Sequence, residues 1–368
     1  MPIHRPPPPR AGAGDPALVR PDWTVVTTRP AGRLWLDKNE NSDPEMARVV
    51  GTVVAGLDPS VFHSYPDLGG LYAKLADHVG LPPACLRLAP GSDGVIHSLF
   101  EAYVAPGDVV LHTTPTFAMY PVYCRMFGAT AVPVAYEPSQ AGPLLTAERL
   151  IDAIKAARPR LVCLPNPDSP TGSVFEPDEL RAIVATAGDA GSLILIDEAY
   201  HPFHPDSAAS WVERNPHLVV ARSTGKAWGL AGFRIGYAIA HPDVAAILHK
   251  VRPMYEVGSV SAAVFAGMLD HADAMRASVS RLLAGKARFV ATLERLGLRV
   301  LPTHGNFAHA AFGDHAAGVH RALEEFVAYR KNFTEPCLNG YSRFSMTTPE
   351  LFQPVLDKIA AVVGQRER

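Results

Sequence analysis

The stretch from Ser223 to Gly236 combines a single lysine with many small residues. Lys226 follows Ser223-Thr224-Gly225, and Arg234 lies eight positions later, between Gly232 and Gly236. A lysine amine forms Schiff bases readily once burial or neighbouring charge lowers its pKa, so Lys226 is a candidate nucleophile. A lone lysine is most often a surface residue. The interpretation therefore depends on which other groups the fold brings to Lys226.

Two other motifs contain groups that suit an anionic ligand. Gly91-Ser92-Asp93-Gly94 lies between a short expected strand and a helix, and a helix amino terminus binds phosphate through its free N–H groups. An ordinary capping turn, with Ser92 or Asp93 as the cap, is the alternative. Arg234, in a stretch that we expect to be a strand, carries a forked guanidinium that also suits phosphate.

Two further motifs follow apolar segments. Asp197 ends the run Leu193–Ile196, and a carboxylate there is either buried and functional or placed at a water-facing edge. Tyr200, three residues on, would reach the same ligand. Asn166 to Gly172 contains two prolines and a glycine and predicts a rigid loop, which is either a simple turn or a ligand contact.

Taken together, these groups describe one ligand. It has a phosphate, an aromatic nitrogen heterocycle that pairs with an aspartate, and an electrophilic carbon near a lysine. Pyridoxal 5′-phosphate (PLP) has all three features, so we predict it as the cofactor.

The elements that must position these groups follow a regular order. Between residues 86 and 239, short apolar strands alternate with helices, which predicts an α/β fold with a mostly parallel sheet covered on both faces. Ligand sites in such sheets form at the carboxyl ends of the strands. After about residue 265 the pattern changes to a long helix, 268–296, and an α+β region.

We therefore expect three regions. Residues 1–30 are rich in proline and predict a flexible arm. Residues 45–265 form the large PLP-binding domain, and residues 31–44 together with 266–368 form a smaller α+β domain.

The composition of the chain argues against several classes of partner. The 368 residues carry 34 basic and 36 acidic side chains, which does not indicate a nucleic-acid partner. The chain has no apolar run near the ~20 residues that span a bilayer. Four scattered cysteines and the proline-interrupted pair His201 and His204 predict neither a disulfide framework nor a metal site. We expect a cytoplasmic protein that is not bound to a membrane.

At this point the motifs resemble a known family. The lysine stretch is similar to that of class I and II aminotransferases of PLP fold type I, which implies a large, mostly parallel seven-stranded sheet domain and a smaller domain. Further matches resemble the histidinol-phosphate aminotransferase branch. These matches are Asp37–Asn41, Ser64–Asp67, Gly91–Asp93, Pro115–Tyr120, Asp197–Tyr200, Gly305–Phe307 and Tyr341–Ser345.

The resemblance implies a role for each matched residue. Lys226 would form the Schiff base and move the proton, and Asp197 would hold the pyridinium N–H. The other cofactor contacts would be Tyr200 and Ser169 at the phenolic oxygen, Phe117 on the ring, Ser92, Asp93, Ser223 and Arg234 at the phosphate, and Tyr65 at the phosphate of a neighbouring subunit. The resemblance thus implies a homodimer with shared active sites. The substrate contacts would be Asn41, Arg330 and Arg343.

The implied reaction is ping-pong transfer of an amino group to a 2-oxo acid. The donor would be an amino acid or an amino alcohol phosphate such as histidinol phosphate. Departures from the family pattern leave the donor open: Ser169 replaces an asparagine, Asp168 adds a charge that would favour a basic amino acid, and residues 329–332 differ. The alternatives are a PLP-dependent decarboxylase, cyclase or eliminase, and an inactive PLP-binding regulatory module.

Overall fold

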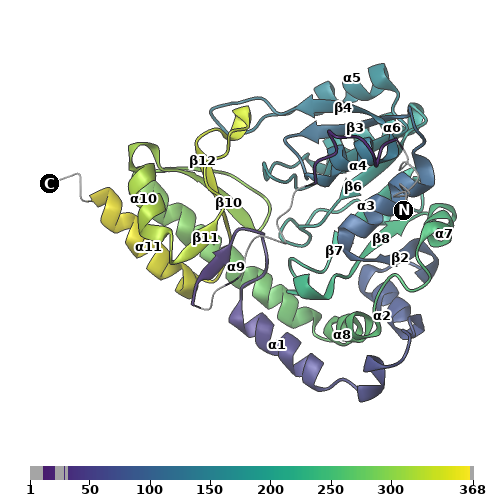
Figure 1. The fold of residues 1–368 in the computed structure, drawn as a ribbon, viewed down its shortest axis with the longest axis horizontal. Helices are drawn as coiled ribbons and strands as arrows, with labels where there is room; N and C mark the ends of the chain where they lie inside the picture. The colour runs from purple at the N-terminus through teal and green to yellow at the C-terminus, as the bar shows by residue number, and fades with distance from the viewer. Residues whose placement is uncertain (1–10, 21–28, 30–31, 365–368) are drawn as a thin grey trace, which may run out of the picture.

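A seven-stranded sheet forms the larger part of the molecule (Figure 1). The computed structural model describes residues 11–20, 29 and 32–364. The strand order is β2-β8-β7-β6-β5-β3-β4, and only β8 runs antiparallel to its neighbours. The strands are β2 (Leu86–Ala89), β3 (Val109–Thr114), β4 (Thr130–Ala135), β5 (Leu161–Pro165), β6 (Leu193–Asp197), β7 (Leu218–Ser223) and β8 (Gly236–Ala240).

Helices cover both faces of this sheet, as the continuous apolar runs predict. Every residue of β5, β6 and β8 is buried. Successive residues point to opposite faces, so Leu195 packs with one group of helices and Ile196 with the other. One face is covered by α3 (Gly91–Tyr103), α4 (Met119–Phe127) and α7 (Pro242–Val251), and the other by α2 (Gly69–Val79), α5 (Ala147–Ala157), α6 (Pro177–Asp189) and α8 (Ser259–Leu269).

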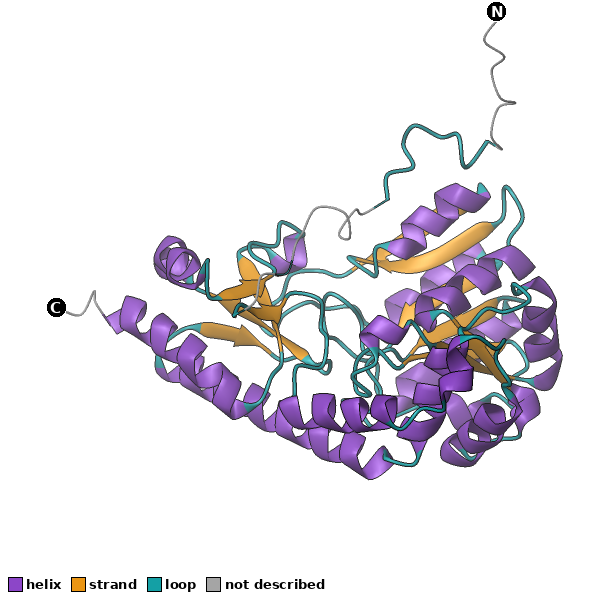
Figure 2. Ribbon diagram, turned by 60° about the horizontal axis from the view of Figure 1, so that its bottom comes forward, coloured by secondary structure: helices purple, strands orange, loops and turns teal. Residues whose placement is uncertain are grey.

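Two small sheets form a second group of strands. In the first, β12 (Tyr341–Ser345), β10 (Phe307–Ala311) and β9 (Arg299–Leu301) are antiparallel. In the second, β1 (Leu34–Leu36) pairs in parallel with β11 (Val327–Tyr329). Loops occupy the zone between the two groups of strands (Figure 2).

Long helices connect the two groups. Helix α9 (Ala272–Arg295) contacts α1 (Pro44–Ala55) at one end and the small antiparallel sheet and α11 (Pro349–Gly364) at the other, with α10 (Ala316–Leu323) packed on α11 (Figure 1). At Gly285, a Cβ would lie 1.8 Å from the carbonyl oxygen of Thr347, so only glycine permits this close approach of α9 to the segment before α11.

The seven-stranded, mostly parallel fold is confirmed, and the structure differs from the sequence analysis in three places. Helix α3 begins at Gly91 with Pro90 at its cap, so neither Ser92 nor Asp93 caps it. The long helix expected over 268–296 is divided at Asp270 and His271 into α8 and α9. Helices α7 and α8 and strand β11 were not predicted; α8 is apolar on nearly all sides and lacks a helical pattern of polar residues.

The division into an arm and two domains stays a prediction. Residues 1–10, 21–28, 30 and 31 of the expected arm lie outside the described residues. Among the described ones, Leu18 packs on the apolar layer between the sheet and α3 and α4, and Asp15 forms an ion pair of 3.7 Å with Arg125 of α4. No helix in the described part of the chain is long and apolar enough to cross a membrane.

Candidate active site

One edge of the large sheet brings together several of the predicted functional residues. Strands β5, β6 and β7 are parallel and end there, which brings the loop after Pro165, Asp197 and the Lys226 turn side by side. Strand β8 runs in the opposite direction, so its first residue, Gly236, lies at the same edge.

Arg234 reaches this edge from outside the strand. The prediction of a strand position for Arg234 was wrong: the residue follows a 3₁₀ turn (Ala231–Phe233) and has a left-handed backbone with φ of 50°. Because β7 and β8 are antiparallel, the chain reverses its direction between them. Arg234 therefore returns to the sheet edge from which β7 ends.

Lys226 is partly buried and its amine is held by the backbone. Its Nζ donates a hydrogen bond of 2.7 Å to the carbonyl oxygen of Lys38 and lies 6.0 Å from the centre of the Tyr200 ring. Burial lowers the pKa of Lys226 to about 8, and the Arg343 guanidinium acts in the same direction. A substantial fraction of the amine is therefore neutral and nucleophilic at mildly basic pH.

Asp197 is a buried carboxylate, not one at a water-facing edge. It is 5 % exposed, and it accepts hydrogen bonds of 3.0 Å from Tyr120 Oη and 3.1 Å from the Ala199 N–H. Burial raises the pKa of Asp197 to about 6. Such a carboxylate gains most from a cationic N–H partner, as a protonated pyridine nitrogen supplies.

Tyr120 was not predicted as a site residue. It is fully buried, and its hydroxyl is one of the two groups that hold Asp197. Phe117, which was predicted, is half-buried and packs edge-on against Tyr120 with 5.8 Å between ring centres. The only sequence signal for Tyr120 was its position in the segment Pro115–Tyr120.

The amino end of α3 and Arg234 form a cradle for an anion. A Cβ on Gly91 would lie 2.9 Å from Arg234 Nη2, so the guanidinium lies over the first turn of α3. A Cβ on Gly236 would lie 2.7 Å from the Ser92 N–H nitrogen, so β8 also approaches this turn closely. Helix N–H groups and a guanidinium at one place suit a phosphate.

Two further residues border this cradle. Ser223 ends β7, and its Oγ accepts a hydrogen bond of 3.1 Å from the Gly225 N–H, which fixes the turn before Lys226. Asp93 lies in the first turn of α3, and its carboxylate accepts a hydrogen bond of 3.0 Å from Tyr123 Oη. The carboxylate of Asp93 is thus held by Tyr123, which leaves its backbone as the group expected to face a phosphate.

Tyr200 lies at the centre of a polar chain. Its hydroxyl donates to Ser169 Oγ at 3.2 Å and accepts from Asn39 Nδ2 at 2.8 Å. Phe307 of β10 packs edge-on against the Tyr200 ring with 5.3 Å between ring centres. Two residues that the resemblance places together, Ser169 and Tyr200, are therefore in direct contact.

Asp168 stabilises its own loop. Its buried carboxylate accepts hydrogen bonds from Thr113 Oγ1 at 3.0 Å and from Thr171 Oγ1 at 2.7 Å, and also from the Thr171 N–H. Burial raises its pKa to about 7. Because these donors satisfy the carboxylate, the structure removes the reason for expecting Asp168 to select a basic amino acid.

The two candidate substrate arginines differ in burial. Arg343 is 7 % exposed, lies over the Phe307 ring at 5.3 Å, and donates to the Asp37 carbonyl oxygen at 3.0 Å, while its buried Nε has no protein partner. Arg330 is exposed, lies 4.2 Å from the centre of the Phe333 ring and pairs with Glu335 at 3.5 Å. An antiparallel backbone bridge joins the two arginines.

Asn41 and Tyr65, the other two predicted site residues, make no hydrogen bond or ring contact with Lys226, Asp197 or the two arginines in the structure of one chain. Asn41 Nδ2 donates to Ala227 O and Ser278 Oγ, both at 3.0 Å, so Asn41 supports the turn that carries Lys226. Tyr65 is 77 % exposed and stacks on Tyr255 with 4.2 Å between ring centres. The fold of one chain therefore leaves Tyr65 at the surface.

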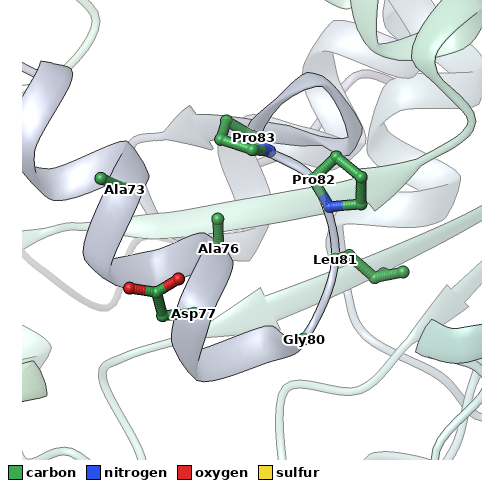
Figure 3. Close-up of a pocket in the computed structure, with 7 residues that line it drawn as sticks. All are labelled: Ala73, Ala76, Asp77, Gly80, Leu81, Pro82 and Pro83. Atoms are coloured by element: carbon green, nitrogen blue, oxygen red, sulfur yellow. The ribbon is translucent and has the colours of Figure 1, made fainter.

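These groups fit PLP. The site offers an amine of lowered pKa, a buried carboxylate and a cradle of helix N–H groups with a guanidinium, which match the three features of the cofactor. Among the described residues no group of three possible metal ligands occurs. A surface depression between the end of α2 and Pro83 is lined by none of the residues of this edge (Figure 3).

The fold and site define an aminotransferase of PLP fold type I. The family described as aminotransferase class I and II matches residues 32–359, and the chain belongs to this family. PLP as the cofactor and transamination as the reaction are thereby confirmed. The decarboxylase, cyclase, eliminase and regulatory alternatives have no support among the matches reported below.

The chain is similar in sequence or fold to several named aminotransferases. The chain is 35 % identical to histidinol-phosphate aminotransferase 2 of Ralstonia nicotianae, over 90 % of this chain and 89 % of the relative. It is 33 % identical to an aromatic amino acid aminotransferase of Streptomyces avermitilis, over 79 % and 80 %. The fold resembles the Sinorhizobium meliloti histidinol-phosphate aminotransferase solved with pyridoxal-5′-phosphate, with a TM-score of 0.77, 23 % identity and coverage of 90 % and 91 %.

Proposed function

We propose that this aminotransferase takes its amino group from an amino acid whose α-carboxylate binds Arg343, or from an amino alcohol phosphate such as histidinol phosphate, and transfers it to a 2-oxo acid. The observation that carries the proposal is the buried Nε of Arg343, which has no protein partner. A buried guanidinium N–H without an acceptor is costly, and a bound anion would satisfy it.

Different residues of the site would hold different parts of the cofactor. The first turn of α3, with Ser92 and Asp93, together with Ser223 and Arg234, would hold its phosphate, and Asp197 its ring nitrogen. Tyr200 and Ser169 would contact its phenolic oxygen, and Phe117 would pack on its ring. When bound, PLP supplies an electron sink for negative charge at the substrate α-carbon.

Lys226 is the proton carrier in this scheme. Its neutral Nζ would take the proton from the substrate α-carbon and would deliver it to the cofactor carbon that is bonded to the substrate nitrogen. The lowered pKa supports this role, because a general base works best when its pKa lies near the operating pH. Arg343 would orient the substrate, and Asn41 would keep the Lys226 turn in place.

A donor panel tests the role of Arg343. Replacing Arg343 with alanine removes a charge-assisted contact, so kcat/KM for glutamate and phenylalanine should fall by about 10- to 100-fold. Replacing Arg330 with alanine should leave these donors almost unchanged and lower kcat/KM for histidinol phosphate by about tenfold if Arg330 contacts the phosphate. Single-turnover spectra of the bound cofactor measure the first half-reaction for each donor.

The exposed Arg321 of α10 provides a matched control, and Arg321→Ala should behave as the wild type. If Arg343→Ala loses no more than Arg321→Ala with every donor, Arg343 does not bind the substrate. If no donor converts the cofactor to its amine form, the donor class proposed here is wrong.

We further propose that two copies of the chain form a dimer through the face around Tyr65. Several large apolar side chains are exposed on this face or on the segments next to it: Phe62 (66 %), Tyr65 (77 %), Met254 (77 %) and Tyr255 (50 %). Ser259 Oγ also bonds the carbonyl oxygen of Ser64, which ties the segment 59–66 to α8. Aromatic and methionine side chains of this kind are enriched in protein interfaces. The dimer would place Tyr65 at the cofactor phosphate of the second copy.

Mixing two inactive variants tests the shared site. Tyr65→Ala and Lys226→Ala should each have low activity, but a hybrid dimer contains one site with both native residues. Random mixing of equal amounts should then restore about a quarter of the wild-type activity. The activity is assayed after subunit exchange, and sedimentation measures the dimer.

Two results would contradict this arrangement: a wild-type chain that sediments as a monomer at assay concentration, or a mixture no more active than its components although mass spectrometry detects the hybrid.

We also propose that the protein is cytoplasmic. All four cysteines are buried and unpaired, which favours the reducing cytoplasm.

A further inference from the structure

Asn39 has contacts that neither the sequence nor the roles described above explain. It lies in the loop between β1 and α1 and is 2 % exposed. Its backbone is left-handed, with φ of 56°, a conformation that asparagine adopts more easily than most residues. Its Nδ2 donates to Tyr200 Oη at 2.8 Å.

Ser345 fixes the orientation of the Asn39 amide. Ser345 Oγ accepts a hydrogen bond of 2.7 Å from the Asn39 N–H, and it donates one of 3.1 Å to Asn39 Oδ1. With Oδ1 used as the acceptor for Ser345, the NH₂ group must face Tyr200. Asn306 Nδ2 bonds the Asn39 carbonyl oxygen at 3.0 Å and holds the backbone from the other side.

The direction of the hydrogen bonds determines what Tyr200 can do. Its oxygen accepts from Asn39, so its own proton is left for an acceptor on the other side, where Ser169 Oγ lies at 3.2 Å. Accepting one hydrogen bond also strengthens the hydroxyl as a donor. Burial raises the pKa of the Tyr200 phenol, while the Arg343 guanidinium and the contacts with Ser169 and Asn39 oppose that rise.

We propose that Asn39 is a positioning residue that directs the Tyr200 hydroxyl proton toward the cofactor and links it, through Ser345, to the strand that carries Arg343. Arg343 and Ser345 lie two residues apart on β12 and so share one face. The proposal rests on the proposed role of Tyr200 at the cofactor's phenolic oxygen. It adds a residue from the loop between β1 and α1 that controls the contact of Tyr200 with the cofactor.

Two substitutions remove the amide donor in different ways. Asn39→Gly keeps the left-handed backbone accessible, and Asn39→Asp keeps the size of the side chain and an acceptor for Ser345. Each should lower kcat/KM by about fivefold to tenfold, the usual effect of one lost hydrogen bond. Each should also move the midpoint of the pH titration of the bound cofactor's visible absorbance in the same direction as Tyr200→Phe, by a smaller amount.

A double variant separates positioning from a general structural effect. If Asn39 acts through Tyr200, then adding Asn39→Gly to Tyr200→Phe should change the titration midpoint and kcat/KM by less than about twofold. Asn332→Gly is the matched control, because Asn332 is also a left-handed asparagine, with φ of 47°, and has no assigned role in the site. This control should leave the midpoint unchanged, and thermal unfolding followed by circular dichroism reports the fold of every variant.

Two results would overturn the proposal, and they differ in meaning. If Tyr200→Phe shifts the midpoint but Asn39→Gly and Asn39→Asp do not, or if the Asn39→Gly effect persists in full without the Tyr200 hydroxyl, then Asn39 has only a structural role. If Tyr200→Phe itself shifts nothing, Tyr200 does not contact the cofactor, and the role proposed above for Tyr200 fails together with that of Asn39.

Discussion

Replacing Lys226 with alanine should reduce transamination by roughly a thousandfold or more, because it removes both the covalent anchor of the cofactor and the proton carrier. The geometry supports a large effect. The Lys226 amine is held at the sheet edge by the Lys38 carbonyl oxygen, and Arg343 and Asp197 are close enough to influence its pKa. No other lysine was predicted to react at this edge.

Two measurements check the result. Steady-state kinetics with a responsive donor give the loss of kcat/KM, and borohydride reduction followed by mass spectrometry identifies the peptide that carries the cofactor. In the wild type this should be the peptide with Lys226. Lys250→Ala, an exposed lysine of α7, is the control and should keep both activity and labelling at Lys226. Labelling of a different lysine in the wild type would refute the assignment.

Replacing Asp197 with asparagine should lower kcat/KM by about 100- to 1,000-fold while the cofactor still attaches to Lys226. The amide keeps the size of the side chain and an acceptor for Tyr120 or the Ala199 N–H, but it has no charge for a protonated ring nitrogen. Without that charge the ring nitrogen loses its proton, and negative charge at the substrate α-carbon is stabilised less well. Single-turnover kinetics should show that the loss falls on the proton-transfer step.

Asp168 provides a matched control for this substitution. It is also a buried carboxylate at the same sheet edge, but Thr113 and Thr171 hold it within its own loop. Asp168→Asn should therefore lower the melting temperature and keep most of the activity. Equal losses of activity in the two variants would show that burial, and not contact with the cofactor, explains the effect of Asp197.

Apolar patterning explains why the sheet was predictable. Strands β5, β6 and β7 each begin with a run of buried apolar residues, and such runs are typical of a central parallel strand. Asp197 ends β6 and Lys226 lies three residues after the end of β7, so their position at the carboxyl edge could be predicted along with the strands.

The failures concern segments that leave little periodic signal in the sequence. Strand β11 has three residues and forms because β1, almost three hundred residues earlier, pairs with it. Arg234 lies outside β8 because it ends a 3₁₀ turn and has a left-handed backbone, and the strand begins only at Gly236. A three-residue strand or a single left-handed residue leaves almost no periodic signal.

By itself, the sequence determined the class of fold and the cofactor, and it predicts Lys226 as the reactive lysine, because each depends on local patterns: buried runs, glycine-rich turns and the residues at their ends. Only the tertiary structure decided how the remaining side chains are used. Asp168 serves its loop, Tyr120 holds Asp197, and Asn39 bonds Tyr200. Hydrogen bonds between residues far apart in the chain depend on distances of about 3 Å that no spacing along the chain encodes.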